Sequence, residues 1–176
     1  MKYGELNLGQ VEAIVNKLGG MDGVQRFLAG HSEVVTKKYV INCNADPFVP
    51  DGWRVEEHQT SGPRNTGLLE WNVSKVSLYL SKKQQGGSIE GNKLREELKG
   101  KPVFNATVLD YLLANPDLIP EEWKGKAVFF WGTVYRYSDG FLCVRFLCWH
   151  GGRWYWGDYW LGHGWYVGNP AAVSVS

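Results

Sequence analysis

The segment KAVFFWGTVYRYSDGFLCVRFLCWHGGRWYWGDYW, residues 126–160, decides the fold of this chain. Two runs rich in β-branched and aromatic residues flank Asp139-Gly140, and an Asp-Gly pair between such runs is a strong hairpin signal. A third aromatic run follows Gly151-Gly152. Because both faces of the first two runs carry bulky apolar side chains, the sequence predicts an antiparallel meander whose first hairpin is buried on both sides.

The third run, residues 153–160, has a different pattern. Side chains of a strand point to opposite faces in turn, so its residues fall into two sets. One set is Trp154, Trp156, Asp158 and Trp160, and the other is Arg153, Tyr155, Gly157 and Tyr159. We expect the tryptophan set to anchor the strand in the core and the other set to be free for presentation.

Two helices are predicted before the meander. Ser88 is a candidate N-cap for a helix carrying Ile89, Leu94 and Leu98. Asn105 is a candidate N-cap for a second helix, which Asn115-Pro116 ends. The pair resembles a helix-turn-helix, but its connection, residues 99–104, is long and its second helix has almost no basic side chains. We therefore expect two helices that cover one face of a sheet.

The N-terminal residues predict a short helical hairpin. Apolar residues recur at helical spacing after Asn7, a plausible N-cap, and Gly19-Gly20 separates a second short helix, for which Asp22 is a candidate cap. A hairpin of this size is not stable alone, so we expect it to dock on a neighbour or on an oligomer partner.

These patterns give three segments. They are a helical head over residues 1–30, a turn-rich linker over 31–52, and a main domain over 53–176. The fold class expected for the main domain is α+β, a mainly antiparallel sheet with two packed helices.

Composition excludes several function classes. The 176 residues carry 19 Lys and Arg against 18 Asp and Glu, so no strong positive field is available for nucleic acid. The sequence has no signal-peptide pattern and no apolar run of transmembrane length, which predicts cytoplasmic synthesis without membrane insertion. Display at the cell surface would then need a non-classical route. Three cysteines without C-x-x-C spacing suit buried thiols and predict no metal site.

No motif for catalysis or for a cofactor stands out, and we expect neither. The four histidines, His31, His58, His150 and His163, lack partners at a metal or triad spacing. Glu56, Glu57 and His58 are the nearest approach to an acid/base cluster, but they equally describe a solvated strand face. An enzyme that uses this cluster is a distant third hypothesis.

The C-terminal segment RWYWGDYWLGHGWYVGNP, residues 153–170, has three interpretations. It can be the last hairpin of the core, because large aromatic residues supply much of the burial in a small domain. It can be a carbohydrate-binding face, with fixed aromatic rings that stack on sugars and with Asp158, His163 and Asn169 as hydrogen-bonding partners. It can also be a protein-binding face, because Tyr, Gly, Asn and Asp on a rigid frame is the composition of paratopes.

The protein-binding interpretation is supported by a codon pattern. The presumed anchors are Trp154, Trp156, Trp160, Leu161, Trp165 and Pro170. Between them lie eleven positions, each of which can be produced from an Asn codon by changing its two adenines. They are Tyr155, Gly157, Asp158, Tyr159, Gly162, His163, Gly164, Tyr166, Val167, Gly168 and Asn169. Lys, Glu, Gln and Met, which cannot be produced in this way, are absent from these positions. Adenine-directed mutagenesis would leave this pattern.

Three features carry a resemblance to a known group of proteins. They are the segments LIPEEWKGKAVFFWGTVYR and GFLCVRFLCWHGGRW, and the frame W-x-W-x-x-x-W-L-x-x-x-W that ends in N-P-A-A. With them, residues 53–173 resemble hypervariable proteins of small-genome uncultivated bacteria, which are similar to the variable proteins of diversity-generating retroelements. The segment VEAIVNKLGGMDGVQRFLAG resembles a helical head found on proteins of such organisms.

The resemblance implies a fold and a function. Variable proteins of this type generally display a ligand-binding surface near the C-terminus of a C-type-lectin-like domain. It therefore implies a non-enzymatic binding protein for an unknown protein or glycan ligand. Residues 53–176 would be a ligand-display domain with a variable C-terminal segment, 153–169, that carries the eleven positions on its surface. Trp154, Trp156, Trp160 and Trp165 would be buried scaffold, so that Trp154→Ala would cost several kcal/mol of stability.

Overall fold

The computed structural model describes residues 7–32, 38–59 and 67–175. The chain divides into two compact units, Met1–Lys37 and Lys38–Ser176. We call the described residues of the first unit the head and those of the second unit the display unit, a name taken from the expectation drawn from the sequence.

The head is a helical hairpin, as the sequence predicts. Helix α1 spans Leu8–Lys17, and Asn7 caps it in a capping box with Gln10. Helix α2 spans Gly20–Leu28, and its N-cap is Gly19. Asp22 lies in the first turn of α2 and is not its cap, because the second helix begins earlier than expected.

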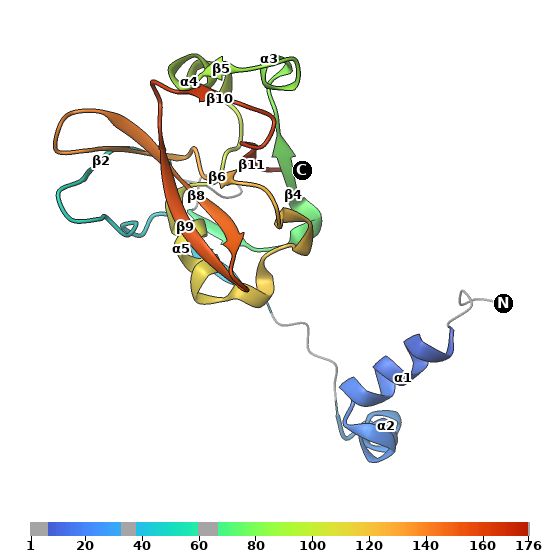
Figure 1. The fold of residues 1–176 in the computed structure, drawn as a ribbon. Helices are drawn as coiled ribbons and strands as arrows, with labels where there is room; N and C mark the ends of the chain where they lie inside the picture. Colours follow the sequence, from blue (N-terminus) through green and yellow to red (C-terminus); the bar gives the residue numbers. More distant parts are fainter. Residues whose placement is uncertain (1–6, 33–37, 60–66, 176) are drawn as a thin grey trace. The chain divides into compact units, whose positions relative to one another are not determined.

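The described part of the display unit holds a sheet of seven strands in the order β2-β7-β8-β6-β11-β4, with β9 paired to β8 (Figure 1). Its pairings are antiparallel except for that of β11 with β6. Two strand pairs lie outside it, β1 with β3 and β10 with β5. The strands are β1 (Val40–Asn42), β2 (Arg54–His58), β3 (Leu68–Glu70), β4 (Val76–Tyr79), β5 (Ile89–Glu90), β6 (Val128–Phe129), β7 (Thr133–Arg136), β8 (Leu142–His150), β9 (Arg153–Trp160), β10 (Gly164–Trp165) and β11 (Ala171–Ser174).

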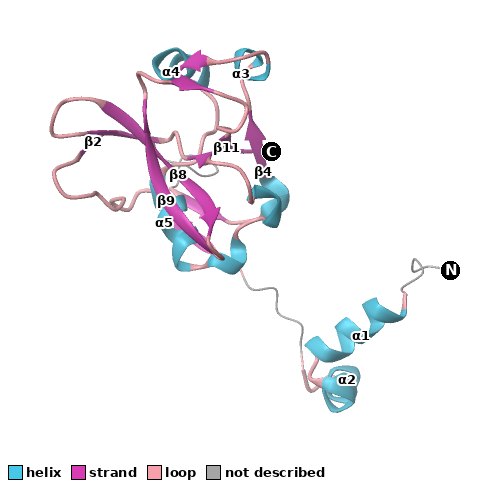
Figure 2. Ribbon diagram, viewed as in Figure 1, coloured by secondary structure: helices cyan, strands magenta, loops and turns pink. Residues whose placement is uncertain are grey.

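The predicted meander is confirmed as β7, β8 and β9. Strand β8 is central, because β9 pairs with it and so do both β6 and β7. Figure 2 shows β8 and β9 as the long strands of the unit. The run that was expected to form one strand breaks at Trp131-Gly132 into β6 and β7. A Cβ on Gly132 would lie 2.8 Å from the backbone nitrogen of Asn105, so only glycine allows this close approach.

Both faces of the sheet are covered, as expected for a central hairpin. Residues of α5 (Ala106–Ala114) pack on one face with Val128 and Leu147, and residues of α4 (Gly91–Leu98) pack on the other with Phe129 and Val144. Figure 1 shows α4, β5 and β10 together at one end of the unit. The two helices therefore cover opposite faces, and the expectation that they share one face is wrong.

Helical turns complete the display unit. They are α3 (Lys82–Gln85), η2 (Val73–Lys75), η3 (Pro116–Leu118) and η4 (Glu121–Trp123). Ile89 lies in β5 and not in the helix that follows, and Glu90 is the N-cap of α4 in place of Ser88. Asn105 is the N-cap residue of α5, but its side chain bonds to the carbonyls of Cys43 and Gln59 instead of capping the helix.

The predicted linker of residues 31–52 is too long at its C-terminal side. Val40–Asn42 forms β1, which pairs with β3, and Ile41 and Cys43 are buried in the core. The display unit therefore begins near Lys38, before the expected boundary at residue 53. The part of the linker at 33–37 lies outside the described residues. Among the described helices, none has the length and apolar character needed to span a membrane.

Candidate ligand-binding surface

The segment after β9 alternates between buried and exposed residues. Leu161, Trp165 and Pro170 are buried, and the residues between them form two exposed turns around the short strand β10. The exposed positions are Gly162, His163, Tyr166, Val167 and Gly168. In this part of the segment the expected anchors lie inside and the expected ligand positions lie outside or at the boundary.

The second turn is held by a residue that sequence reasoning missed. The buried side chain of Gln84 donates hydrogen bonds from Nε2 to the carbonyl oxygens of Tyr166 and Asn169, at 3.1 and 2.9 Å. Gln84 also closes a capping box with Ser81 at the start of α3. The Ser-x-x-Gln spacing is the signal that could have identified this helix start. Because the contacts are to backbone oxygens, they fix the turn without restricting its side chains.

Strand β9 differs from the predicted division into anchor and display faces. Trp154 and Trp160 are half-buried, and Trp156 is 37% exposed. On the opposite face, Tyr159 packs against Phe129 and Trp165. The expectation that all four tryptophans are buried holds for Trp165 and is wrong for Trp156. The reason is that α4 and β10 cover the tyrosine face of β9, whereas the tryptophan face remains partly open.

Gly157 is packed against its cross-strand neighbour. It pairs with Phe146, and a Cβ at position 157 would lie 2.5 Å from the Phe146 ring. Phe146 is itself packed against Phe129, with ring centroids 4.9 Å apart. A side chain at position 157 therefore requires the ring of Phe146 to move within the core.

Replacing Gly157 by alanine is expected to lower the free energy of unfolding by about 1–3 kcal/mol, the usual cost of overpacking a filled site. Gly168→Ala is the matched control, because a Cβ there meets no atom within 4 Å and Gly168 is not among the glycines with positive φ. Urea denaturation of both variants measures the difference. Equal midpoints for the two variants would contradict the packing described for Gly157.

Aromatic side chains lie around the first turn and along the tryptophan face. His163 contacts the rings of Trp160 and Tyr159, with centroids 4.7 and 5.1 Å away. Phe48 contacts Trp156 edge-on, at 5.7 Å. Such rings offer broad apolar contact area with few rotatable bonds.

Asp158 supplies a carboxylate between Trp156 and Trp160. Its Oδ2 accepts a hydrogen bond from the Tyr137 hydroxyl, whose pKa is raised well above its usual value, first by burial and then by this bond. The Asp158–Tyr137 pair joins β9 to the end of β7. Among the described residues, Asp158 Oδ1 makes no hydrogen bond, so it can accept one from a ligand.

A second residue that sequence reasoning missed is Arg145, which is 1% exposed and lies on β8 beneath Trp156. Its Nη2 lies 2.9 Å from Asp110 Oδ1, and its guanidinium lies 4.5 Å from the centre of the Trp156 ring. Nη1 donates to the Phe48 carbonyl oxygen, and the Phe48 amide donates to Asp110 Oδ2. Arg145 therefore fixes both the segment around Phe48 and the underside of Trp156.

The candidate acid/base residues are held in ordinary structural contacts. Glu56 pairs with Arg136 and Glu57 with Arg95, each at 2.6 Å. The Arg136 bond holds the pKa of Glu56 below its usual value. His58 Nδ1 lies 2.8 Å from the Thr133 hydroxyl, so the cluster is divided among three different partners. Glu57, His58 and Arg95 also border a cavity of about 360 Å³, together with Trp131.

The remaining polar candidates do not converge. Within the described ranges, no group of three His, Cys, Asp or Glu side chains could hold a metal ion. Cys43 and Cys143 are buried free thiols, and burial raises their pKa values to about 11 and about 12. His31 lies in the head, and His150 is exposed at the end of β8. The structure thus brings together only the C-terminal candidates, His163 among them.

No family model, no curated protein and no solved structure matches this chain.

Proposed function

We propose that the chain is a non-enzymatic binding module that presents residues 155–169 to a protein ligand, and that a retroelement diversifies this surface. The observation that carries the proposal is the alternation after β9, where Leu161, Trp165 and Pro170 are buried and the positions between them are not. Substitutions are tolerated where a side chain contributes little burial and stability comes from elsewhere. In this chain, the source of stability is the sheet, because both of its faces are covered.

The eleven proposed contact positions differ in how well they tolerate substitution. None of them is fully buried, but their surroundings differ. His163, Tyr166, Val167 and Gly168 are exposed, whereas Gly157 is confined by Phe146. We therefore infer that the two turns carry most of the variation and that β9 supplies a more constant aromatic floor.

The proposed fold type is C-type-lectin-like. A mixed sheet with helices on both faces, and a ligand segment that precedes the last strand, are compatible with that type. In such a fold, stability and ligand binding are carried by different parts, because the variable turns attach to a scaffold whose stability does not depend on them.

The proposal predicts where natural variation occurs. We expect sequencing of the encoding locus and its paralogues to find substitutions that trace to adenines of a template repeat, beside a reverse transcriptase gene. They should concentrate in the codons of His163, Tyr166, Val167 and Gly168 and be rare at Gly157. Slow variation spread evenly over residues 127–176, with no template repeat, would contradict the proposal.

A second candidate function, a carbohydrate-binding domain with fixed aromatic stackers, is favoured by one observation. The Trp156 ring is partly open beside Phe48, and Arg145 supports it from below. In that case the wild-type chain binds a member of a glycan array, and Trp156→Ala loses the binding at a temperature well below its own unfolding midpoint, where circular dichroism shows the variant to be folded. Retained binding in this variant would exclude Trp156 as the stacking residue.

A further inference from the structure

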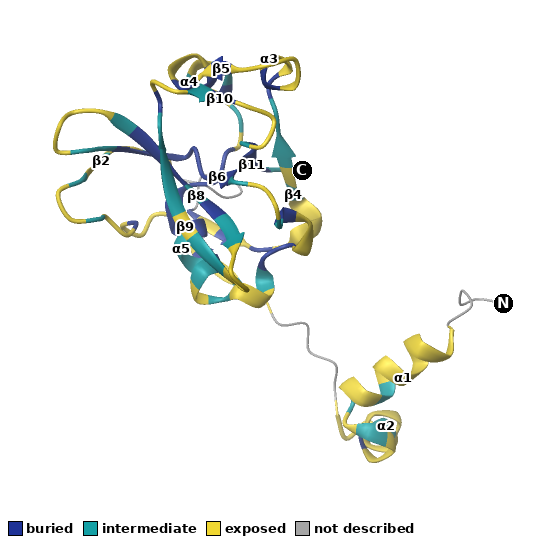
Figure 3. Cartoon of the chain, viewed as in Figure 1, coloured by how far each residue is buried: buried dark blue, intermediate teal, exposed yellow. Residues whose placement is uncertain are grey.

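The head exposes most of its apolar side chains. Figure 3 colours almost all of α1 and most of α2 as exposed, and Gly23 is the one buried residue in the described part of the two helices. Leu8 is 80% exposed and Leu28 is 78% exposed. Other exposed apolar residues of the head are Val11, Ile14, Met21 and Phe27. A hairpin with no buried apolar side chain lacks the burial needed to offset the entropy of ordering its chain.

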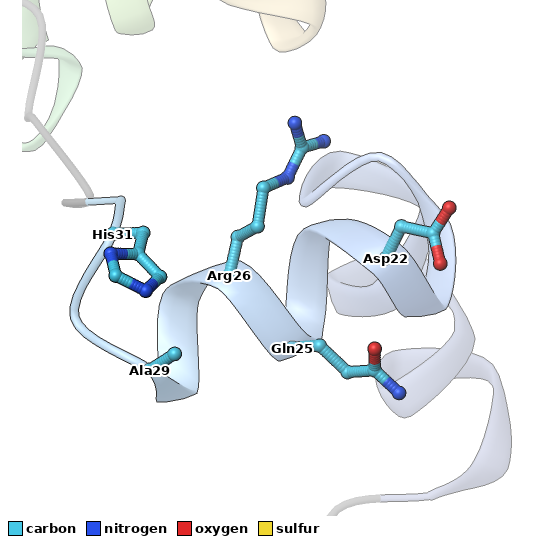
Figure 4. Close-up of a pocket in the computed structure, with 5 residues that line it drawn as sticks. All are labelled: Asp22, Gln25, Arg26, Ala29 and His31. Atoms are coloured by element: carbon cyan, nitrogen blue, oxygen red, sulfur yellow. The ribbon is translucent and has the colours of Figure 1, made fainter.

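The polar residues of α2 lie on a separate side. Asp22, Gln25, Arg26 and Ala29, with His31, border an open hollow of about 460 Å³ (Figure 4). On α1, Asn16 lies away from Val11, Ile14 and Leu18 by helical spacing, and Glu12 borders the apolar side beside Leu8. The apolar and polar residues therefore occupy different sides of each helix, and the apolar side is unpartnered within the head.

The size of the head favours a second copy as the partner. Units below about 40 residues usually need oligomerisation, disulfides or metals, whereas many units of about 55–65 residues are stable alone. The head supplies roughly half of that size, and the described residues of the head include no cysteine. Two copies together provide four short helices, which is the number that forms the simplest bundle core.

The charges of the head are also self-complementary. The two helices carry Glu12 and Asp22 as anions and Lys17 and Arg26 as cations. This balance gives no preference for an acidic or a basic partner. In a two-fold symmetric pair, the same surface of each copy faces the other. Equal numbers of anions and cations on that surface allow opposite charges to face each other.

We propose that the apolar sides of two heads associate, so that two copies of the chain form a dimer through a four-helix core. This association does not depend on the function proposed above. If that function holds, the dimer carries two ligand surfaces, and simultaneous engagement raises the apparent affinity for a repetitive target.

The test is the mass of the full chain in solution as a function of concentration. We expect sedimentation velocity to give twice the monomer mass at high concentration, with far-UV helicity falling as the chain dissociates on dilution. Leu8→Lys combined with Leu28→Lys is expected to reduce the mass to that of one chain. Both side chains are exposed, so the substitutions cost the separated chain little.

The matched control is Asn16→Lys combined with Ala29→Lys, which adds the same charge on the polar sides and should leave the dimer intact. A wild-type chain that stays monomeric at high concentration would overturn the proposal. So would a dimer that survives the Leu8 and Leu28 substitutions, because the contact would then lie in the display unit. Neither result bears on locus variation, so this failure is distinguishable from that of the proposed function.

Discussion

Asp110→Ala is expected to lower the free energy of unfolding by about 3–5 kcal/mol, because it leaves the Arg145 guanidinium buried without its anion. Arg145 is 1% exposed, whereas the Asp110 side chain is 27% exposed, so the cation bears most of the desolvation cost. The ion pair at 2.9 Å is the only carboxylate contact of Arg145 among the described residues. Arg145 Nε already lacks a hydrogen-bond partner, so the site has no spare acceptor.

Substitution of the other partner of the ion pair should cost less free energy of unfolding. Arg145→Met removes the buried charge and keeps much of the apolar stem, and it leaves Asp110 where water can reach it. The double variant Asp110→Ala/Arg145→Met should therefore be more stable than Asp110→Ala alone. Urea unfolding of the four proteins measures this cycle. If Asp110→Ala cost less than Arg145→Met, the charge would not be the source of the effect.

The consequence for the ligand surface is specific. The Asp110 carboxylate also accepts a hydrogen bond from the Phe48 amide, and the Phe48 ring lies against Trp156. Loss of the pair should therefore loosen the segment around Phe48, detectable as faster amide hydrogen exchange there than in β11.

The meander was predictable because its signals are local. Asp139-Gly140 and Gly151-Gly152 mark the turns of the meander. All four residues lie at turns in the structure, and all three glycines have positive φ. Apolar residues on both faces of the first two runs of the meander indicate a hairpin that is covered on both sides. These features depend on near neighbours in the chain, so one sequence suffices to read them.

The elements that cover each face of β9 were not predictable in the same way. Alternation divides β9 into two faces but does not say which face the rest of the chain covers. Tyr159 packs under β10 because Gly164-Trp165 turns back to pair with Ile89-Glu90, a long-range contact that has no local signal. Arg145 was missed for a similar reason, since its anion lies on α5, far away in the sequence.

Trp165→Ala is expected to lower the free energy of unfolding by about 3–5 kcal/mol, the range for removing a large buried aromatic residue. Trp165 is fully buried, and its ring lies 4.3 Å from Phe129 and 4.6 Å from Trp131. Because Trp165 lies between the two exposed turns, its loss should also speed amide exchange over residues 162–169. Trp154→Ala should cost clearly less, since Trp154 is only half-buried.

Trp165→Phe separates ring packing from hydrogen bonding. The indole Nε1 of Trp165 has no hydrogen-bond partner in the described structure, so phenylalanine removes a buried unsatisfied donor and loses only part of the ring volume. We expect it to retain more than half of the stability that alanine loses. An equal loss in both variants would place the contribution of Trp165 in the indole atoms that phenylalanine lacks. Nε1 is one of them, and it lies so close to Gly91 that a Cβ on Gly91 would be 2.4 Å away. The anchor between the turns would then depend on that single contact and not on the aromatic cluster.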